Sequence, residues 1–352
     1  MNAFIYNAYA ARVVFGAGSL KHLEREIDAL GYKRALVLST PEQRASAQMV
    51  ADLLGARAAG VFDRAVMHVP IETAREAREV AHQLGADCAV AIGGGSTTGL
   101  GKAIALDSGL PIIAIPTTYA GSEMTPVYGI TEGGLKKTGK DAKVVPRAVI
   151  YDPELTVSLP PAMSLTSGIN AIAHSAEGLY SADRNPVIDF MARDGIAALG
   201  RALPAICKNP QDMQARTDAF YGAWLCGIVM GSVGMALHHK LCHTLGGTFN
   251  LPHAECHTVV LPHALAYNAP AAPEAMTKIA QALGGSSGPA AVFDLARDNG
   301  AAVALRDLGM KQADLDKACD IAVQNQYPNP RPLDRAALRQ LFQNAWEGVR
   351  PG

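Results

Sequence analysis

Residues 88–106 read CAVAIGGGSTTGLGKAIAL, and this stretch decides the fold class of the first half of the chain. Residues 88–92 form a short apolar run that is typical of a buried strand, and they lead directly into GGGS at 93–96. A helix is expected over residues 97–106. At such a junction backbone N–H groups can approach a phosphate closely, and the helix dipole favours its negative charge. The simpler alternative is a tight turn that only joins a strand to a helix.

The same alternation of strand and helix extends over the first half of the chain. Short apolar runs alternate with helical stretches of about ten residues or more, which indicates βαβ units and a mostly parallel sheet. In such sheets ligands bind outside the carboxyl ends of the strands. The expected strands are residues 12–15, 34–38, 60–62, 88–92 and 112–115, and the expected helices are residues 22–30, 43–54, 71–84 and 97–106.

Three of the expected strand ends carry small polar residues or glycine, which predicts a site for the pyrophosphate of a dinucleotide. The glycine turn is not a P-loop, because Ala103 follows Lys102, and it is not the G-x-G-x-x-G fingerprint, because Thr98 stands at the third glycine position. No acidic residue ends the second strand, so the sequence permits NADP(H) as well as NAD(H). The predicted cofactor contacts at these ends are Ser39, Thr40, Gly94, Gly95, Ser96, Thr117 and Thr118.

The second half of the chain has a different pattern. From about Ser164 onward, apolar residues recur with the period of a helix, and the alternation of a strand is missing. The turn-rich segment 152–162 separates the two patterns. We therefore predict a Rossmann-like α/β nucleotide-binding domain over residues 1–160 and an all-α catalytic domain over residues 161–352.

Six of the ten histidines lie in residues 237–263, LHHKLCHTLGGTFNLPHAECHTVVLPH. His239 and His243 are four positions apart, so on a helix their side chains project from the same face. His253 follows a Gly-Gly break and a proline, and it can return to that face from a turn or from the start of a new helix. A single histidine is most often a packed or solvated residue, whereas a cluster at helical spacing indicates an acid–base or metal site.

The composition is that of an ordinary soluble globular protein. The 352 residues are 49% hydrophobic and 18% charged with a formal net charge of −1, so we expect neither nucleic-acid binding nor a polybasic arm. No apolar run is long enough to predict a membrane span, and the first residues lack the pattern of a signal peptide. The six cysteines are scattered without CxxC pairs, which favours reduced thiols and a cytoplasmic location.

Taken together, these motifs resemble the iron-containing (group III) alcohol dehydrogenase superfamily over nearly the whole chain. The shared motifs are GAGSL near the start, GGGS, PTT and GSE at 116–123, the DPxL turn, the NAIAH helix and the histidine block. The resemblance implies a dehydroquinate-synthase-like architecture, with the active site in the cleft between an α/β domain and a helical domain. It also places the family's metal ligands at Asn170, His174, His239 and His253, and a cofactor-contacting lysine near Lys136.

Three positions depart from the superfamily pattern. Asn170 stands where the metal-binding aspartate belongs, Gly99 replaces the aspartate of GGGSxxD, and PTTYAGSE is one residue shorter than usual. With these departures the motifs are similar to the maleylacetate reductase branch, whose members reduce the carbon–carbon double bond of maleylacetate to 3-oxoadipate in bacterial aromatic degradation. That resemblance implies a dicarboxylate substrate, NADH or NADPH as cofactor, no required metal, and a homodimer.

The residues suit that reaction chemically. Hydride transfer to a ketone gives a basic alkoxide that benefits from a metal, whereas hydride transfer to a 4-oxo-2-enoate gives a delocalised enolate that hydrogen-bond donors can stabilise. We expect His243, or else His253, to polarise the carbonyl group and supply the proton. The predicted catalytic residues are His243, His253, His174, His239, Tyr119 and Asn170, with no metal ligand among them.

Other functions stay open at this point. A metal-dependent alcohol dehydrogenase acting on a small alcohol or aldehyde would need iron or zinc, and three histidines with Asn170 weaken such a site without forbidding it. A dehydroquinate-synthase-like lyase is disfavoured by the missing acidic ligand, and a silent nucleotide-binding protein by the clustered histidines. The choice between NADH and NADPH and the acceptance of chlorinated maleylacetates are also open.

Overall fold

The computed structural model describes residues 4–9, 12–133, 135–324 and 327–352. It divides into two compact units, one formed by Ala8–Leu159 and the other by Pro160–Gly352 together with the segment that ends at Asn7. The first unit, here called the α/β unit, contains the strands, and the second, here called the helical unit, consists of helices and loops in its described part. The assignment of nucleotide binding to one unit and of catalysis to the other remains a prediction.

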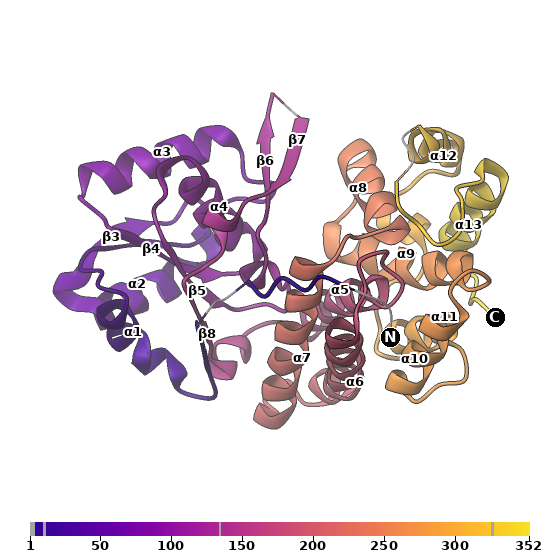
Figure 1. The fold of residues 1–352 in the computed structure, drawn as a ribbon, viewed down its shortest axis with the longest axis horizontal. Coiled ribbons are helices and arrows are strands. Elements are labelled where there is room, and N and C mark those ends of the chain that lie inside the picture. The colour runs from indigo at the N-terminus through magenta and orange to yellow at the C-terminus, as the bar shows by residue number, and fades with distance from the viewer. Residues whose placement is uncertain (1–3, 10–11, 134, 325–326) are drawn as a thin grey trace. The chain divides into compact units, whose positions relative to one another are not determined.

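The core of the α/β unit is a six-stranded sheet in the order β1-β8-β5-β4-β2-β3 (Figure 1). All strand pairs described in this sheet are parallel, and the expected fold class is therefore confirmed. The last residue of β4, Gly93, pairs with Pro116 at the end of β5. The strands are β1 (Arg12–Phe15), β2 (Ala35–Leu38), β3 (Ala58–Phe62), β4 (Cys88–Gly93), β5 (Ile112–Pro116) and β8 (Ala148–Tyr151).

Four helices cover the two faces of this sheet: α1 (Leu23–Ala29), α2 (Arg44–Leu54), α3 (Ile71–Gln83) and α4 (Gly95–Ser108). Val90 of β4 lies in a hydrophobic core with residues of α1 and α2, whereas its neighbour Ala91 lies in a core with residues of α3 and α4. Successive side chains of a strand point to opposite faces, so a strand covered on both faces is apolar at every position. This explains the continuous apolar run of β4, which is buried throughout.

Three of the observed strands are not expected from the sequence. β8 has only four residues, and β6 (Val127–Glu132) and β7 (Leu135–Lys140) form a separate antiparallel hairpin. The sequence of β7, LKKTGK, is polar and has low strand propensity. It is a strand because β6 satisfies its backbone hydrogen bonds, and such pairing is not visible in the local sequence.

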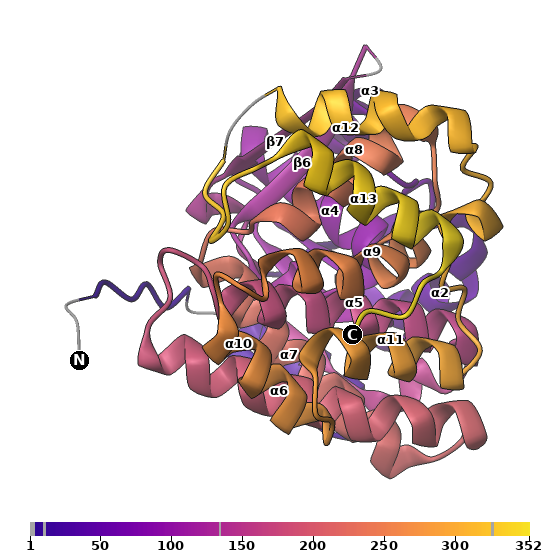
Figure 2. The ribbon, with the colours of Figure 1, turned by 90° about the vertical axis from the view of Figure 1, so that its right-hand side faces the viewer.

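The central helix of the helical unit is α5 (Pro161–Gly178), which is buried along nearly all of its length from Ser164 onward. It packs against α6, α7 and α9, and a helix covered on all sides needs small or apolar residues all round. Figure 2 shows the helices that follow it in the chain. They are α6 (Pro186–Lys208), α7 (Met213–Ser232), α8 (Leu237–Phe249), α9 (His253–Asn268), α10 (Pro273–Leu283), α11 (Gly288–Asp298), α12 (Leu315–Val323) and α13 (Arg335–Glu347).

None of the described helices is by itself long and apolar enough to cross a membrane. The bent pair of α7 and α8, which meet at 94°, has the length and composition of a span only when the two helices are taken together.

Short 3₁₀ helices lie at Ser19–His22, Pro41–Gln43, Gly55–Arg57, Ser122–Met124, Ala142–Val144, Pro153–Thr156, Leu305–Leu308 and Gln312–Asp314.

Candidate active site

The predicted phosphate-binding turn lies between β4 and α4. β4 ends at Gly93, and Gly94 is the N-cap residue of α4 and gives no side-chain cap to the first N–H groups of the helix. β2 and β5 flank β4 in the sheet, so Ser39 and Thr117 lie at the same edge as the turn. Backbone donors at a helix N-terminus without a side-chain cap suit an anion such as a pyrophosphate. The α/β unit thus brings together predicted cofactor residues from three neighbouring strands.

Close packing explains why two positions of this turn are glycine. Gly93 has a φ of +151°, and a Cβ there would lie 2.4 Å from Oγ1 of Thr97. A Cβ on Gly94 would lie 3.0 Å from Cγ2 of Thr118, and the N–H of Thr117 donates to the carbonyl oxygen of Gly93 at 3.0 Å. Gly93 is not among the predicted contacts, yet its backbone conformation and its surroundings both require glycine.

The other predicted cofactor residues differ in accessibility. Gly95 is exposed and Ser96 is partly exposed, so a ligand can reach both. Ser39 is fully buried, and its hydroxyl has no hydrogen-bond partner among the described residues. Thr40 precedes the 3₁₀ helix that starts at Pro41. Lys136 lies in β7, but its side chain is outside the described part of the structure.

Tyr119 is one of the predicted catalytic residues. The structure places Tyr119 in the α/β unit, where its side chain is fully buried. The predicted histidines and Asn170 all lie in the helical unit. The predicted catalytic group is therefore divided between the two units, and the role of Tyr119 remains a prediction.

Lys102 of α4 is a buried cation that the sequence pattern does not single out. Its Nζ atom donates to oxygen atoms of Ser122, Thr125 and Val127 at distances from 2.6 to 2.9 Å. Burial lowers the pKa of Lys102 to about 7, and the negative charge of Glu123 opposes this shift. These hydrogen bonds tie α4 to the segment that follows β5, and so Lys102 holds the loop beside the glycine turn.

The predicted histidines come together from three helices of the helical unit. His174 lies on α5, and His239 and His243 lie on α8. His253 is the first residue of α9, which is one of the two placements that the sequence left open. The ring centroids of His174 and His239 are 5.0 Å apart, and those of His239 and His243 are 6.4 Å apart. His257 lies between the histidines of α8 and His253 of α9, because its ring centroid is 5.1 Å from that of His239 and 4.3 Å from that of His253.

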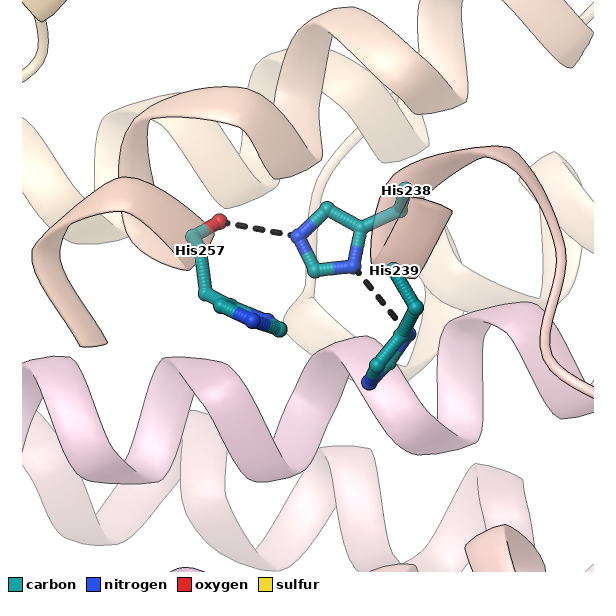
Figure 3. A group of neighbouring side chains, drawn as sticks. All are labelled: His238, His239 and His257. Atoms are coloured by element: carbon teal, nitrogen blue, oxygen red, sulfur yellow. Dashed lines mark hydrogen bonds between the residues drawn. The ribbon is translucent and has the colours of Figure 1, made fainter. Parts of the chain in front are cut away.

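His238 and His257 belong to the same cluster, although neither is in the predicted site (Figure 3). Nε2 of His238 is 3.0 Å from the backbone oxygen of His257, and since a carbonyl oxygen only accepts, this nitrogen carries the proton. Burial lowers the pKa of His238 to about 3 and that of His257 well below its usual value. Both rings are therefore neutral at pH 7. Their presence in the dense histidine block was the only sequence signal for them.

Several buried polar atoms of the cluster have no hydrogen-bond partner among the described residues. They include Oδ1 of Asn170, Nδ1 of His174 and Nε2 of His239. Burial and the neighbouring histidines lower the pKa of His174 well below its usual value, so it is neutral. The hydroxyl of Tyr327 is also unpartnered, and burial and the charge of Glu177 raise its pKa. Buried polar atoms are normally hydrogen-bonded, so these atoms indicate the place of a polar ligand.

Glu177 of α5 is a buried carboxylate that is missing from the predicted site. Its Oε2 accepts hydrogen bonds from Nδ1 of His239 at 2.7 Å and from the N–H of Ala236 at 3.0 Å, and its Oε1 accepts one from the N–H of His238 at 2.7 Å. Burial by itself raises the pKa of Glu177, but the hydrogen bond and charge of His239 outweigh it and leave the pKa below its usual value. Glu177 is therefore ionised and joins α5 to the start of α8.

Comparison with known families identifies the class of this protein. Residues 164–346 match the C-terminal domain of the Fe-containing alcohol dehydrogenase family, and residues 10–153 match the iron-containing alcohol dehydrogenase family. Together these matches cover both units. The chain belongs to the iron-containing alcohol dehydrogenase family, and it is an oxidoreductase.

Individual relatives narrow this class. The chain is 66% identical to maleylacetate reductase of Burkholderia cepacia over 351 residues, which are 100% of both chains. It is 58% identical to maleylacetate reductase of Pseudomonas sp. (strain P51) over 348 residues, or 99% of each chain. The crystal structure of maleylacetate reductase from Agrobacterium tumefaciens is 52% identical, covers 100% of both chains and superposes with a TM-score of 0.97. The resemblance to maleylacetate reductases is thereby confirmed.

The family name implies iron, and the atoms that the histidine cluster leaves to hold a divalent metal are neutral. Ring nitrogens of His238, His239 and His257 lie within 4.8 Å of one another. Nε2 of His238 and Nδ1 of His239 have hydrogen-bond partners, whereas Nε2 of His239 and both ring nitrogens of His257 have none among the described residues. Asn170 offers a neutral amide oxygen, and Glu177 already accepts four hydrogen bonds, one of them from the hydroxyl of Tyr180. Within the described cluster no carboxylate is left to bind the cation, which weakens a metal site, although three imidazoles are enough to hold zinc.

Proposed function

We propose that this protein reduces the carbon–carbon double bond of maleylacetate to give 3-oxoadipate, with NADH or NADPH as the hydride donor. The observation that carries the proposal is the full-length identity of 66% with a maleylacetate reductase. The neutral histidines and the amide of Asn170 support it. An enolate can be stabilised by such hydrogen-bond donors, whereas the alkoxide formed by an alcohol dehydrogenase benefits from a metal.

The reaction adds one hydride and one proton to the substrate. A bound nicotinamide supplies the hydride, which the alkene carbon farther from the ketone receives. The electron pair of the double bond moves toward the ketone oxygen and gives an enolate. The alkene carbon next to the ketone then takes a proton, the ketone re-forms and both carboxylates are unchanged. The protein must therefore stabilise one oxyanion and deliver one proton.

Residues of the helical unit suit these two tasks. We assign the proton to His243, which is exposed on this unit and can exchange protons with solvent, whereas His174 is buried and neutral. His253 is partly exposed and is the second candidate. The side-chain N–H groups of Asn170 can donate to a substrate carboxylate, which an aspartate at this position would repel.

Metal independence is part of this proposal, and Asn170→Asp tests whether the neutral side chain at position 170 is what weakens cation binding. We expect the substitution to tighten Zn²⁺ binding by at least about tenfold. Loss of a residue that only hydrogen-bonds to a metal ligand already changes metal affinity by about that factor, and a new anionic ligand should change it more. The measurement is titration calorimetry on EDTA-treated protein. Asn209→Asp adds the same charge at the exposed end of α6 and serves as the control. Equal affinities in the two variants would show that position 170 is not next to a cation site.

The function itself is tested by following absorbance at 340 nm with EDTA-treated protein, NADH or NADPH, and freshly prepared maleylacetate. We expect rapid oxidation of the cofactor that chelator does not slow, and no oxidation with simple aldehydes. Activity that returns only after Zn²⁺ or Fe²⁺ is added would instead support a metal-dependent dehydrogenase. The same assay decides between NADH and NADPH and shows whether chlorinated maleylacetates are accepted.

Two further properties are proposed from the family resemblance. We expect a homodimer, which sedimentation equilibrium would show as twice the chain mass of 36.9 kDa. We also expect a cytoplasmic location, in keeping with the scattered free cysteines. A monomeric mass at micromolar concentration would contradict the first expectation.

A further inference from the structure

Glu177 connects two parts of the histidine cluster that are far apart in the chain. It lies 62 residues before His239 and three residues after His174, so it occupies the face of α5 that points toward α8. Its side chain is completely buried, and both carboxylate oxygens accept hydrogen bonds from the start of α8. Ala236, the N-cap residue of α8, provides no side-chain cap. The carboxylate of Glu177 takes that role from another helix.

The hydrogen bond from His239 decides which of its ring nitrogens carries the proton. An ionised carboxylate can only accept, and Oε2 of Glu177 is 2.7 Å from Nδ1 of His239. Nδ1 must therefore carry the hydrogen. In the neutral ring the other nitrogen, Nε2, is then bare and can only accept. The structure gives that nitrogen no partner among the described residues, and the ring of His174 is stacked on the ring of His239 with the centroids 5.0 Å apart.

We propose that Glu177 is a positioning residue of the reductase site, which fixes His239 in the Nδ1–H form and so presents Nε2 as a hydrogen-bond acceptor. The inference rests on the proposed function and adds a residue to it. A bare nitrogen cannot bind the carboxylates or the ketone oxygen of maleylacetate, because those atoms also only accept. Its partner must be a cation or a hydrogen-bond donor, and in the proposed reaction that donor is a water molecule or the protonated group that supplies the second hydrogen of the reduction.

Glu177→Gln separates this role from simple helix capping. Glutamine has nearly the same shape, but its amide N–H₂ group would face Nδ1 of His239 as a donor. His239 would then take the opposite form, with the proton on Nε2, and its site-facing nitrogen would change from acceptor to donor. A histidine held in the wrong form lowers turnover by roughly 10⁴-fold in serine proteases. We expect kcat for maleylacetate to fall by about 10²- to 10⁴-fold, with the KM for NADH within twofold of wild type.

The direct readout is nitrogen NMR of histidine-labelled protein, which distinguishes protonated from bare ring nitrogens without any need for activity. The His239 signals are identified by their loss in His239→Gln. We expect a protonated Nδ1 and a bare Nε2 in wild type, the reverse in Glu177→Gln, and the wild-type pattern with partly restored kcat in Glu177→Asp. Asp212→Asn weakens the cap of α7, where Asp212 accepts from Ala215, and is the control for lost capping.

The proposal is overturned if His239 has the same protonation pattern in wild type and Glu177→Gln. It is also overturned if Asp212→Asn, at matched loss of thermal stability, lowers kcat as much as Glu177→Gln does. Failure of wild type to reduce maleylacetate would refute the proposed function, while the NMR comparison would still decide what Glu177 does to His239.

Discussion

Replacing His243 with alanine should lower kcat for maleylacetate reduction by about 10²- to 10⁴-fold, the usual contribution of a positioned general acid. The KM for NADH should stay nearly unchanged, because His243 is not among the predicted cofactor contacts, which lie at the strand ends of the α/β unit. Stopped-flow absorbance at 340 nm would separate hydride transfer from cofactor binding. The fold should be retained, since His243 is exposed.

A suitable control is His82→Ala, which removes an exposed histidine from α3. We expect wild-type turnover from it. If His243→Ala also turns over normally, His243 is not the proton donor, and His253→Ala becomes the next variant to measure. Loss of activity in both His243→Ala and His253→Ala would mean that the two rings act as a unit, and their effects would not add.

Gly93→Ala should destabilise the protein by about 2–5 kcal/mol and raise the KM for NADH about tenfold or more. The φ of +151° is unfavourable for alanine, and the new Cβ would lie 2.4 Å from Oγ1 of Thr97 and 2.7 Å from Oε1 of Gln43. Both neighbours must move, and Gln43 also donates a hydrogen bond of 2.8 Å to Oγ1 of Thr117, which is a predicted cofactor contact. Chemical denaturation and NADH titration would measure the two effects.

Gly109→Ala is the matched control for this prediction. Gly109 also has a positive φ, of +72°, and it ends the same helix, α4. A Cβ there meets nothing within 4 Å, so only the backbone cost of about 1 kcal/mol is expected, with NADH binding unchanged. Equal destabilisation by the two variants would show that the space around Gly93 is not limiting.

Local patterns in the sequence are enough to predict most of the α/β unit. The strand at 88–92, the glycine turn and the helix after it all follow from hydrophobic period and glycine content, which are properties of neighbouring residues. Strand β7 of the hairpin is not predictable in this way, because its polar sequence becomes a strand only by pairing with β6. The same is true of Lys102, whose burial depends on oxygen atoms 20 to 25 residues away.

For the histidine cluster, too, part of the arrangement can be predicted from the sequence and part depends on the folded structure. The four-residue spacing of His239 and His243 is enough to predict that they share a face of one helix, because spacing along a helix sets the direction of a side chain. For His253 the sequence left a turn or a helix start open, and the structure has the helix start. The neutral Asn170, at the position where the family has an acid, is also evident from the sequence. Which ring nitrogen of His239 is bare depends on the folded structure, because the carboxylate of Glu177 that holds the other nitrogen comes from a different helix. The protonation state of a buried histidine depends on its burial and on hydrogen bonds from distant segments, and both exist only once the chain has folded.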